Sequence, residues 1–346
     1  MIIDPYLKRE LLAHANVLLA RSALPSALSI ELMSGGGNNQ LFRLQAENEQ
    51  YVLKRYYHSD DDPRDRFGHE VSFLEYAKQA TPGWVPDLIA CDKTHRLSIM
   101  SFEPGERPQS VSHAMVKAAA SFIRQLNVQD IPKQLPVAAD ASFTVQEHGM
   151  RVFNRINQLT VLPAYTDHLR FKGLVANLTY EFNRWQKTFH KALIQGVIND
   201  EELLSSHRVI SPSDFGFHNA LLHGNRIIFV DFEYAGIDDP LKLIADFFSQ
   251  VAQPVPLAFL GAFLGELALS KDVKRRIDQH LFHFLQLTRI KWCCIQLRAF
   301  ASEGQRRLAF SQNDATEALR DRMLSSAEMQ IENLRSTMSR DKHGLH

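Results

Sequence analysis

The segment VISPSDFGFHNALLHGNRIIFVDFEYAGIDDP, residues 209–240, constrains this chain more than any other part of its sequence. The proline, serines and glycine around Asp214 indicate a loop, NALL and RIIFV have the character of short strands, and HGN between them is typical of a tight turn. A hairpin brings its two ends together. We therefore expect Asn219, where the first strand opens, and Asp231, where the second ends, to lie close in space.

These residue types suit phosphoryl transfer. Oxygen ligands from Asn219 and Asp231 at one hairpin mouth would suit a hard cation that keeps several waters, above all Mg2+. Asp214, in the neighbouring loop, could then accept a proton. An acidic base, an asparagine five residues later and a second aspartate beyond a short hairpin follow the order of a protein-kinase catalytic loop. The alternative is structural, with Asp214 as a turn residue and Asn219 satisfying a backbone turn.

The N-terminal part of the chain contains the other groups that such a site needs. Residues 28–57 show apolar runs broken by GGGNN and AENEQ, which predicts three antiparallel strands with a flexible glycine turn after the first. Bare backbone amides of that turn could approach phosphate. Lys54 lies on the third predicted strand, and Glu70, on the following helix, is placed to pair with it. Asp62 is placed to cap that helix.

The stretch EPGERP, residues 103–108, separates two regions of different character. Before it, VPDLIACD and RLSIMSF are strand-like, whereas most of residues 110–206 has a helical pattern and helices resume from about Asp239. We therefore predict an N-terminal nucleotide-binding lobe, residues 1–103, and a C-terminal lobe, residues 104–346, with the catalytic and metal loops and the acceptor pocket.

Resemblance to a known family is found in five stretches: GGGNNQLFRL, YVLKRYY, FGHEVSFLEYA with Glu70, LSIMSFEPGE and the central segment. Over roughly residues 30–250 the chain resembles the aminoglycoside phosphotransferase and choline kinase superfamily, small-molecule kinases with a protein-kinase-like fold. The resemblance implies an α+β fold of two lobes. An antiparallel sheet with one helix packed on it would form the N-terminal lobe, and the C-terminal lobe would be mainly helical. It also implies ATP and Mg2+ as cofactors and a small-molecule hydroxyl acceptor.

The same resemblance implies a role for each matching residue. Asp214 matches the catalytic base, and Asn219 and Asp231 match the magnesium ligands. Lys54 and Glu70 match the pair that positions the phosphates. The residues implied to bind the nucleotide are Gly35, Gly36, Gly37, Asn38, Lys54, Glu70, Met100, Ser101 and Phe102, of which the last three fall where the family's linker lies against the adenine.

One departure leaves an alternative open. The family usually has a histidine two residues before the catalytic aspartate, and this chain has Pro212 there. The protein could therefore be a pseudokinase that binds a nucleotide or a partner without chemistry. Two neighbouring residues also keep two interpretations: Glu233 could touch a second Mg2+ or lie in solvent, and His218 could reach the phosphates or only pack.

The charge of the last quarter of the chain bears on the acceptor. A strongly cationic acceptor needs an acidic pocket, but here a basic cluster is found instead. It favours a sugar or sugar-like metabolite, with an aminoglycoside or amino alcohol as the alternative. The cluster consists of Lys274, Arg275, Arg276, Arg289, Lys291 and Arg298.

Composition excludes several other classes. Lysine plus arginine equals aspartate plus glutamate, 39 each, so no net charge draws the chain to nucleic acid or anionic lipid. The N-terminus has no signal-peptide pattern, and the apolar residues 252–270 are too few and too interrupted to span a membrane. Three cysteines give no disulfide framework or zinc-site spacing. We expect a cytoplasmic monomer or homodimer with no nucleic-acid or membrane partner.

Overall fold

The computed structural model describes residues 4–33, 37–311 and 316–340, which form two compact units. The described residues of unit 1 lie within Met1–Ala139, Pro212–Gly236 and Arg306–Asp314. Those of unit 2 lie within Asp140–Ser211, Ile237–Gln305 and Ala315–His346. Each unit is thus assembled from three separate stretches of chain. The predicted lobes, residues 1–103 and 104–346, are a functional division and stay a prediction.

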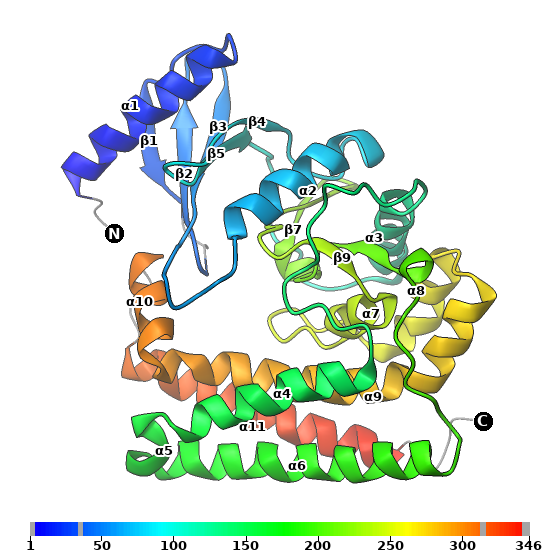
Figure 1. Ribbon diagram of the computed structural model, residues 1–346. Helices are drawn as coiled ribbons and strands as arrows, with labels where there is room; N and C mark the ends of the chain where they lie inside the picture. The colour runs from blue at the N-terminus through cyan, green and yellow to red at the C-terminus, as the bar shows by residue number, and fades with distance from the viewer. Residues whose placement is uncertain (1–3, 34–36, 312–315, 341–346) are drawn as a thin grey trace. The chain divides into compact units, whose positions relative to one another are not determined.

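Unit 1 is built on a five-stranded antiparallel sheet, as the alternating apolar runs predict (Figure 1). Its strand order is β1-β2-β3-β5-β4. Side chains of β2 alternate between buried and accessible positions, with Phe42 and Leu44 fully buried, because successive residues of a strand point to opposite faces. The strands are β1 (Ser29–Leu32), β2 (Gln40–Gln45), β3 (Gln50–Arg55), β4 (Leu88–Asp92) and β5 (Leu97–Ser101).

Two helices pack on this sheet. Helix α1 (Pro5–Arg21) buries Leu11, Leu18 and Leu19 in a core shared with the strands. Helix α2 (Arg66–Ala80) buries one face that includes Glu70. The residue that caps α2 is Asp65, whose side chain accepts a hydrogen bond from the amide of Gly68 at 3.0 Å. The prediction that Asp62 is the cap was therefore wrong.

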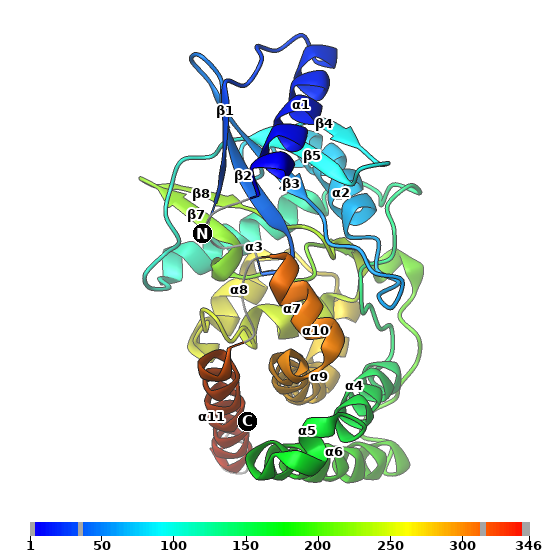
Figure 2. The same ribbon diagram turned by 90° about the vertical axis from the view of Figure 1, so that its left-hand side faces the viewer.

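The central segment contributes a hairpin to unit 1. Strands β7 (Ala220–His223) and β8 (Arg226–Phe229) pair antiparallel and lie side by side in Figure 2, as the sequence predicts. Their turn contains Gly224 at φ 58°, a conformation that glycine adopts without steric cost. The apolar side of the hairpin packs against helix α3 (His113–Leu126) in an aromatic cluster. This cluster consists of Trp84, Phe122, Phe215, Phe217 and Phe229.

Unit 2 is mainly helical. Its helices are α4 (Val145–Thr160), α5 (Pro163–Asp167), α6 (Leu169–Ile194), α7 (Pro240–Phe248), α8 (Leu260–Glu266), α9 (Lys271–Leu297) and α11 (Glu317–Arg340), while α10 (Ser302–Phe310) runs from unit 2 into unit 1. Short strands β6 (Val209–Ser211) and β9 (Gly236–Asp238) pair with each other. Single turns of 3-10 helix are η1 (Ser205–His207), η2 (Phe217–Asn219), η3 (Leu257–Phe259) and η4 (Arg298–Phe300).

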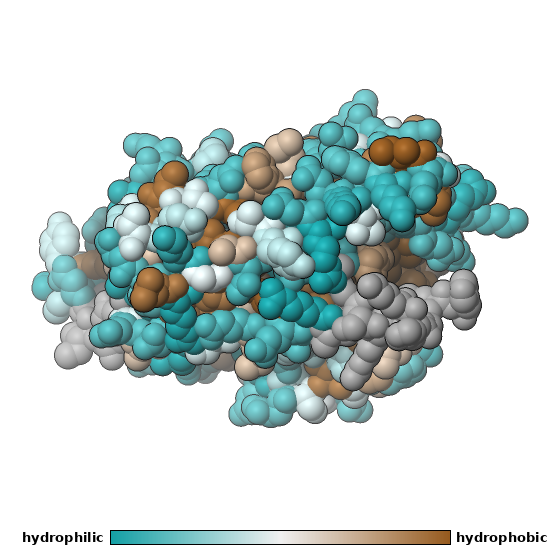
Figure 3. Space-filling view, turned by 90° about the horizontal axis from the view of Figure 1, so that it is seen from below, coloured by the Kyte–Doolittle hydropathy of each residue, from teal (hydrophilic) through white to brown (hydrophobic). Residues whose placement is uncertain are grey.

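The surface in Figure 3 is mostly hydrophilic, with hydrophobic residues scattered over it singly or in small groups. Helix α4 is amphipathic, with Val145, Val152 and Ile156 among its buried residues, whereas every residue of α7 is buried. None of the helices in the described ranges is both long and apolar enough to cross a membrane.

Unit 2 has charged groups in its core. Lys242 is fully buried on α7, and its Nζ lies 2.8 Å from Asp238 and 2.9 Å from Asp246. Asp246 also pairs with Lys291 of α9, and Asp239, the cap of α7, pairs with Arg276 at 2.8 Å. Lys291 and Arg276 belong to the basic cluster of the sequence, so two of its members lie in internal ion pairs.

Candidate active site

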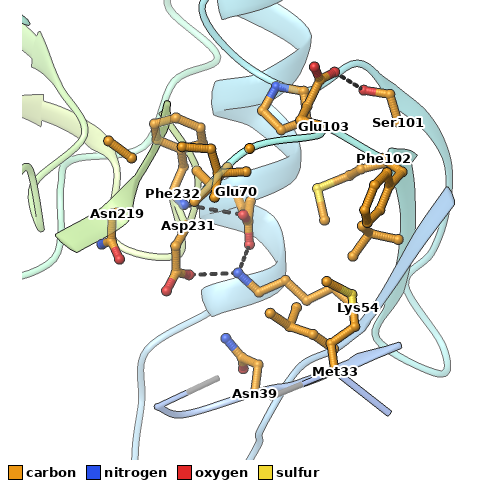
Figure 4. A pocket seen from close by; sticks show the side chains of 18 of the residues that line it. Met33, Asn39, Lys54, Glu70, Ser101, Phe102, Glu103, Asn219, Asp231 and Phe232 are labelled. Carbon is orange, nitrogen blue, oxygen red and sulfur yellow. Dashed lines mark hydrogen bonds and ion pairs between the residues drawn. The ribbon is translucent and has the colours of Figure 1, made fainter. Parts of the chain in front are cut away.

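The centre of the site in unit 1 is a buried lysine between two carboxylates (Figure 4). The Nζ of Lys54 lies 2.5 Å from Oε2 of Glu70 and 2.6 Å from Oδ1 of Asp231. Strand β3, helix α2 and the loop after β8 supply these three residues. The predicted pair of Lys54 and Glu70 is thus present, and the structure adds Asp231 to it.

The protein stabilises the charge of this lysine although its side chain is buried. Lys54 is only 3% exposed, and burial alone would lower its pKa. The charges of Asp231 and Glu70 act in the other direction and bring the pKa of Lys54 well above its usual value. The lysine is therefore a fixed positive charge at neutral pH.

The backbone of the hairpin holds Asp231 in place. Asp231 has φ 69°, in the left-handed region that is uncommon for residues other than glycine. The amide of Phe232 donates to Oε1 of Glu70 at 3.1 Å, and the amide of Val230 donates to the carbonyl of Asn219 at 2.9 Å. The bond from Val230 to Asn219 joins the two ends of the hairpin and brings Asn219 and Asp231 together, as the sequence predicts.

Asp214 lies in a constrained loop just before Asn219. The amide of Asp214 bonds to the carbonyl of Pro212 at 2.9 Å, and Ser213 between them has φ 66°. The side-chain amide of Asn219 donates to the backbone carbonyl of Asp214 at 3.1 Å. Nε2 of His218 lies 3.3 Å from Oδ1 of the Asp214 carboxylate, so His218 faces the predicted base.

A cavity of about 560 Å3 opens in front of Lys54 and is lined by residues of unit 1 alone (Figure 4). One part of its wall is apolar and the other carries Lys54, Glu70 and Asp231. Such a combination suits a flat base at one end and charged groups at the other. The predicted site residues on its wall are Gly37, Lys54, Glu70, Met100, Ser101, Phe102, Asn219 and Asp231.

Two of the described residues predicted for the site, Asn38 and Asp214, are not part of this cavity wall. The predicted nucleotide residues Gly35 and Gly36 lie outside the described residues. Asn38 directs its side chain to Glu233 and Tyr234. Asp214 belongs to the same unit but is not part of the cavity wall.

A buried network beside the cavity is the part of the site that the sequence did not reveal. Glu233 is 1% exposed and accepts hydrogen bonds from the side chains of Asn38 and Asn39. The interpretation that Glu233 lies in solvent was therefore wrong, and its contact with a second Mg2+ stays a prediction. Burial and the charge of Asp231 raise the pKa of Glu233, against the opposing charges of Lys54 and Arg66. The Asn38-Asn39 doublet after the glycines was the only signal in the sequence.

The donor set in the cavity wall fits Mg2+. It offers the carboxylate of Asp231 and the amide of Asn219, both with oxygen ligands. The amide nitrogen of Asn219 bonds to Asp214, which leaves its oxygen as the end available to a cation. Among the described residues no cluster of three or more histidine, cysteine, aspartate or glutamate side chains could hold a metal. A cation at this place would thus complete its shell with water and phosphate oxygens.

Comparison with known proteins gives one family match for the sequence. The sequence model described as "Phosphotransferase enzyme family" matches residues 29–276. No match was found among curated proteins.

Solved structures with the same fold include three kinases of small molecules. A spectinomycin phosphotransferase in complex with ADP and spectinomycin is 13% identical, with a TM-score of 0.58 over 93% of this chain and 98% of the other. A choline kinase from Cryptosporidium parvum is 13% identical, with a TM-score of 0.59 over 95% and 96%. The choline kinase LicA from Streptococcus pneumoniae is 14% identical, with a TM-score of 0.55 over 95% and 99%. The fold is therefore the predicted α+β, protein-kinase-like one.

Proposed function

The chain belongs to the phosphotransferase enzyme family and is a small-molecule kinase, and we propose that it transfers the γ-phosphoryl group of ATP to a hydroxyl group of its acceptor. The observation that supports this proposal most is the contact of Lys54 with both Glu70 and Asp231 in the wall of one cavity. A lysine held in this way presents a fixed charge to the phosphates, and phosphoryl transfer depends mainly on such positioning and charge neutralisation.

The nucleotide would occupy the cavity with its base against Met100, Ser101 and Phe102. Residues 1–103 would then act as the nucleotide lobe and residues 104–346 as the lobe for catalysis and the acceptor. Asn219 and Asp231 would hold Mg2+, which neutralises phosphate charge when bound. Glu70 keeps Lys54 aimed at the phosphates and fixes the loop of Asp231 through the amide of Phe232.

Asp214 would orient the acceptor hydroxyl and take its proton at a carboxylate oxygen. Its loop is kept rigid without the usual histidine: the carbonyl of Pro212 bonds to the amide of Asp214, and Asn219 bonds to its carbonyl. His218 contacts Oδ1 of Asp214, which favours proton acceptance at Oδ2. These contacts support a working enzyme over the pseudokinase alternative.

A sugar or sugar-like acceptor is the substrate class that we propose. The basic cluster supports it less than the sequence suggests, because Lys291 and Arg276 lie in ion pairs inside unit 2. The same pairs provide a different argument. The buried carboxylates Asp238, Asp239 and Asp246 are neutralised by the chain's own cations. They do not offer a cationic aminoglycoside or amino alcohol an unneutralised acidic group.

The test is the variant Asp214→Asn, with hydroxylated metabolites screened by ATP consumption to find the acceptor. We expect turnover to fall by roughly 10²–10⁴-fold, because a positioned base contributes about that much. Thermal stability and binding of ADP should stay as in the wild type. Undiminished transfer by this variant would exclude Asp214 as the base. A wild-type protein that ATP stabilises equally with and without Mg2+ would instead support the pseudokinase.

A further inference from the structure

Glu233 joins parts of unit 1 that are far apart in the sequence. Its Oε1 accepts a hydrogen bond from the side-chain amide of Asn38 at 2.5 Å, and its Oε2 accepts one from Asn39 at 2.5 Å. These asparagines precede it by 195 and 194 residues. The guanidinium of Arg66, on α2, lies 3.5 Å from Oε2. One buried carboxylate thus contacts the two residues before β2 and the first residue of α2.

The orientation of Asn39 is determined by its second bond. Its Oδ1 accepts a hydrogen bond from the amide of Tyr57 at 3.0 Å, so its amide nitrogen must be the end that faces Glu233. Asn38 also donates to the hydroxyl of Tyr234 at 3.0 Å. Both asparagines are therefore donors toward Glu233, and an ionised carboxylate is the side chain that accepts from both of them.

Arg66 stiffens the other side of this network. It is 1% exposed, and its Nη2 lies 2.6 Å from Oδ2 of Asp62. Its guanidinium lies over the ring of Tyr57, 5.7 Å from the centroid, and over that of Tyr234 at 5.8 Å. Arg66 is thus paired with two buried carboxylates, Asp62 and Glu233, and this pairing limits the arrangements that Glu233 can adopt.

We propose that Glu233 is a positioning residue that fastens residues 37–39 to the loop of Asp231. Gly37 and Asn39 are on the wall of the cavity, and Asp231 stands two residues before Glu233. This connection sets the distance between residues 37–39, which would cover the phosphates, and Asp231 on the opposite side of the cavity. Because both carboxylate oxygens already accept amide hydrogen bonds, Glu233 acts through Asn38 and Asn39 and not as a metal ligand. This role rests on the proposed nucleotide-dependent transfer.

The experiment compares Glu233→Gln with the wild type in three measurements. Hydrogen–deuterium exchange of residues 37–45 without nucleotide should be about fivefold faster, because the amide group of the glutamine turns an N–H toward one asparagine donor. The Kd for ADP in EDTA should rise about tenfold, and the KM for ATP likewise, with kcat within about threefold. The Mg2+ concentration for half-maximal activity should not change. Glu47→Gln, an exposed carboxylate in the turn before β3, is the matched control.

Exchange of the donor and the acceptor between Asn38 and Glu233 tests the proposed connection directly. Asn38→Asp alone sets two carboxylates against each other, but together with Glu233→Gln it lets the glutamine amide donate to the new carboxylate. The double variant should therefore recover most of the lost ADP affinity and slow exchange. If Glu233→Gln fails to fold, Asn38→Ala provides the same test, because it removes only one donor to Glu233. It should show faster exchange and weaker ADP binding, both to a smaller extent.

Three results would each overturn the proposal. The first is wild-type exchange and ADP affinity in Glu233→Gln. The second is a double variant that is as impaired as Glu233→Gln alone. The third is a defect confined to the Mg2+ requirement, which would make Glu233 a metal ligand. Exchange and ADP binding in EDTA need no turnover, so the fastening can hold even if the proposed transfer reaction is wrong.

Discussion

Lys54 is a single amine whose removal tests the centre of the site. The variant Lys54→Met leaves Glu70, 1% exposed, without its cation and should destabilise the apoprotein by about 3 kcal/mol. It should also lower kcat/KM by roughly 10²-fold or more, because the fixed charge at the phosphates is lost. Urea unfolding and steady-state kinetics measure the two effects.

Glu70→Gln is the informative companion, since Lys54 then keeps its contact with Asp231 at 2.6 Å. We expect a smaller loss, about tenfold in kcat/KM, and a cost in stability of only about 1 kcal/mol. Equal losses in the two variants would show that Glu70, and not the charge of Lys54, is the main requirement.

Residue identities in the site could be predicted to very different degrees. Lys54, Glu70, Asn219 and Asp231 were found because each stands on or beside a short element whose type the local pattern indicates. The environment of Glu233 could not be predicted, because its partners Asn38 and Asn39 are almost two hundred residues away in the sequence. No local pattern indicates such a contact.

At the scale of elements, we expect two histidines of α9 to make unit 2 sensitive to acid. Burial lowers the pKa of His280 to about 4, helped by the charge of Arg276 and by His283. Burial lowers the pKa of His283 to about 4 as well. A histidine with a lowered pKa stabilises the fold above its ordinary value of 6.5, and this stability is lost as the pH falls toward 4.

The double variant His280→Leu with His283→Leu should therefore lose less stability on acidification than the wild type. The difference between pH 7 and pH 4.5 should shrink by on the order of 2 kcal/mol for each histidine, measured by urea unfolding. His223→Asn, at an exposed histidine of the β7–β8 hairpin, should follow the wild type. An unchanged pH profile in the double variant would show that other groups cause the acid sensitivity.

Helix boundaries depend on choices that the sequence leaves open. Four aspartates precede α2, and any of the last three could cap it: Asp61, Asp62 or Asp65. The structure uses Asp65 because Asp62 is taken by Arg64 and Arg66, each 2.6 Å away. Propensity predicts that a cap exists here, but tertiary ion pairs decide which acid serves.

At the scale of the whole molecule, unit 1 is discontinuous. Its sheet lies within residues 1–139, whereas Phe215, Phe217 and Phe229 of its aromatic cluster come from residues 212–236. A fragment of residues 1–139 would expose the faces of Trp84 and Phe122 that contact these rings. We expect this fragment to lack a cooperative thermal transition and to aggregate, as calorimetry and light scattering would show. A sharp transition would mean that the first segment folds alone.

This interleaving also marks the limit of the fold prediction. Alternating and helical periodicities were enough to place the five strands and the helix-rich remainder, because those patterns are local. The return of residues 212–236 to the first unit was not predicted, because it depends on contacts between stretches with no shared periodicity.

The positive φ angles of Ser213 and Asp231, 66° and 69°, have a consequence for laboratory evolution. A positive φ is unfavourable for most residues other than glycine and asparagine. Selection for heat tolerance alone is therefore expected to enrich glycine at position 213. That change would also loosen the turn before Asp214. Selection for turnover should therefore remove glycine from position 213. Selection for heat tolerance and selection for turnover should thus favour different residues at this position.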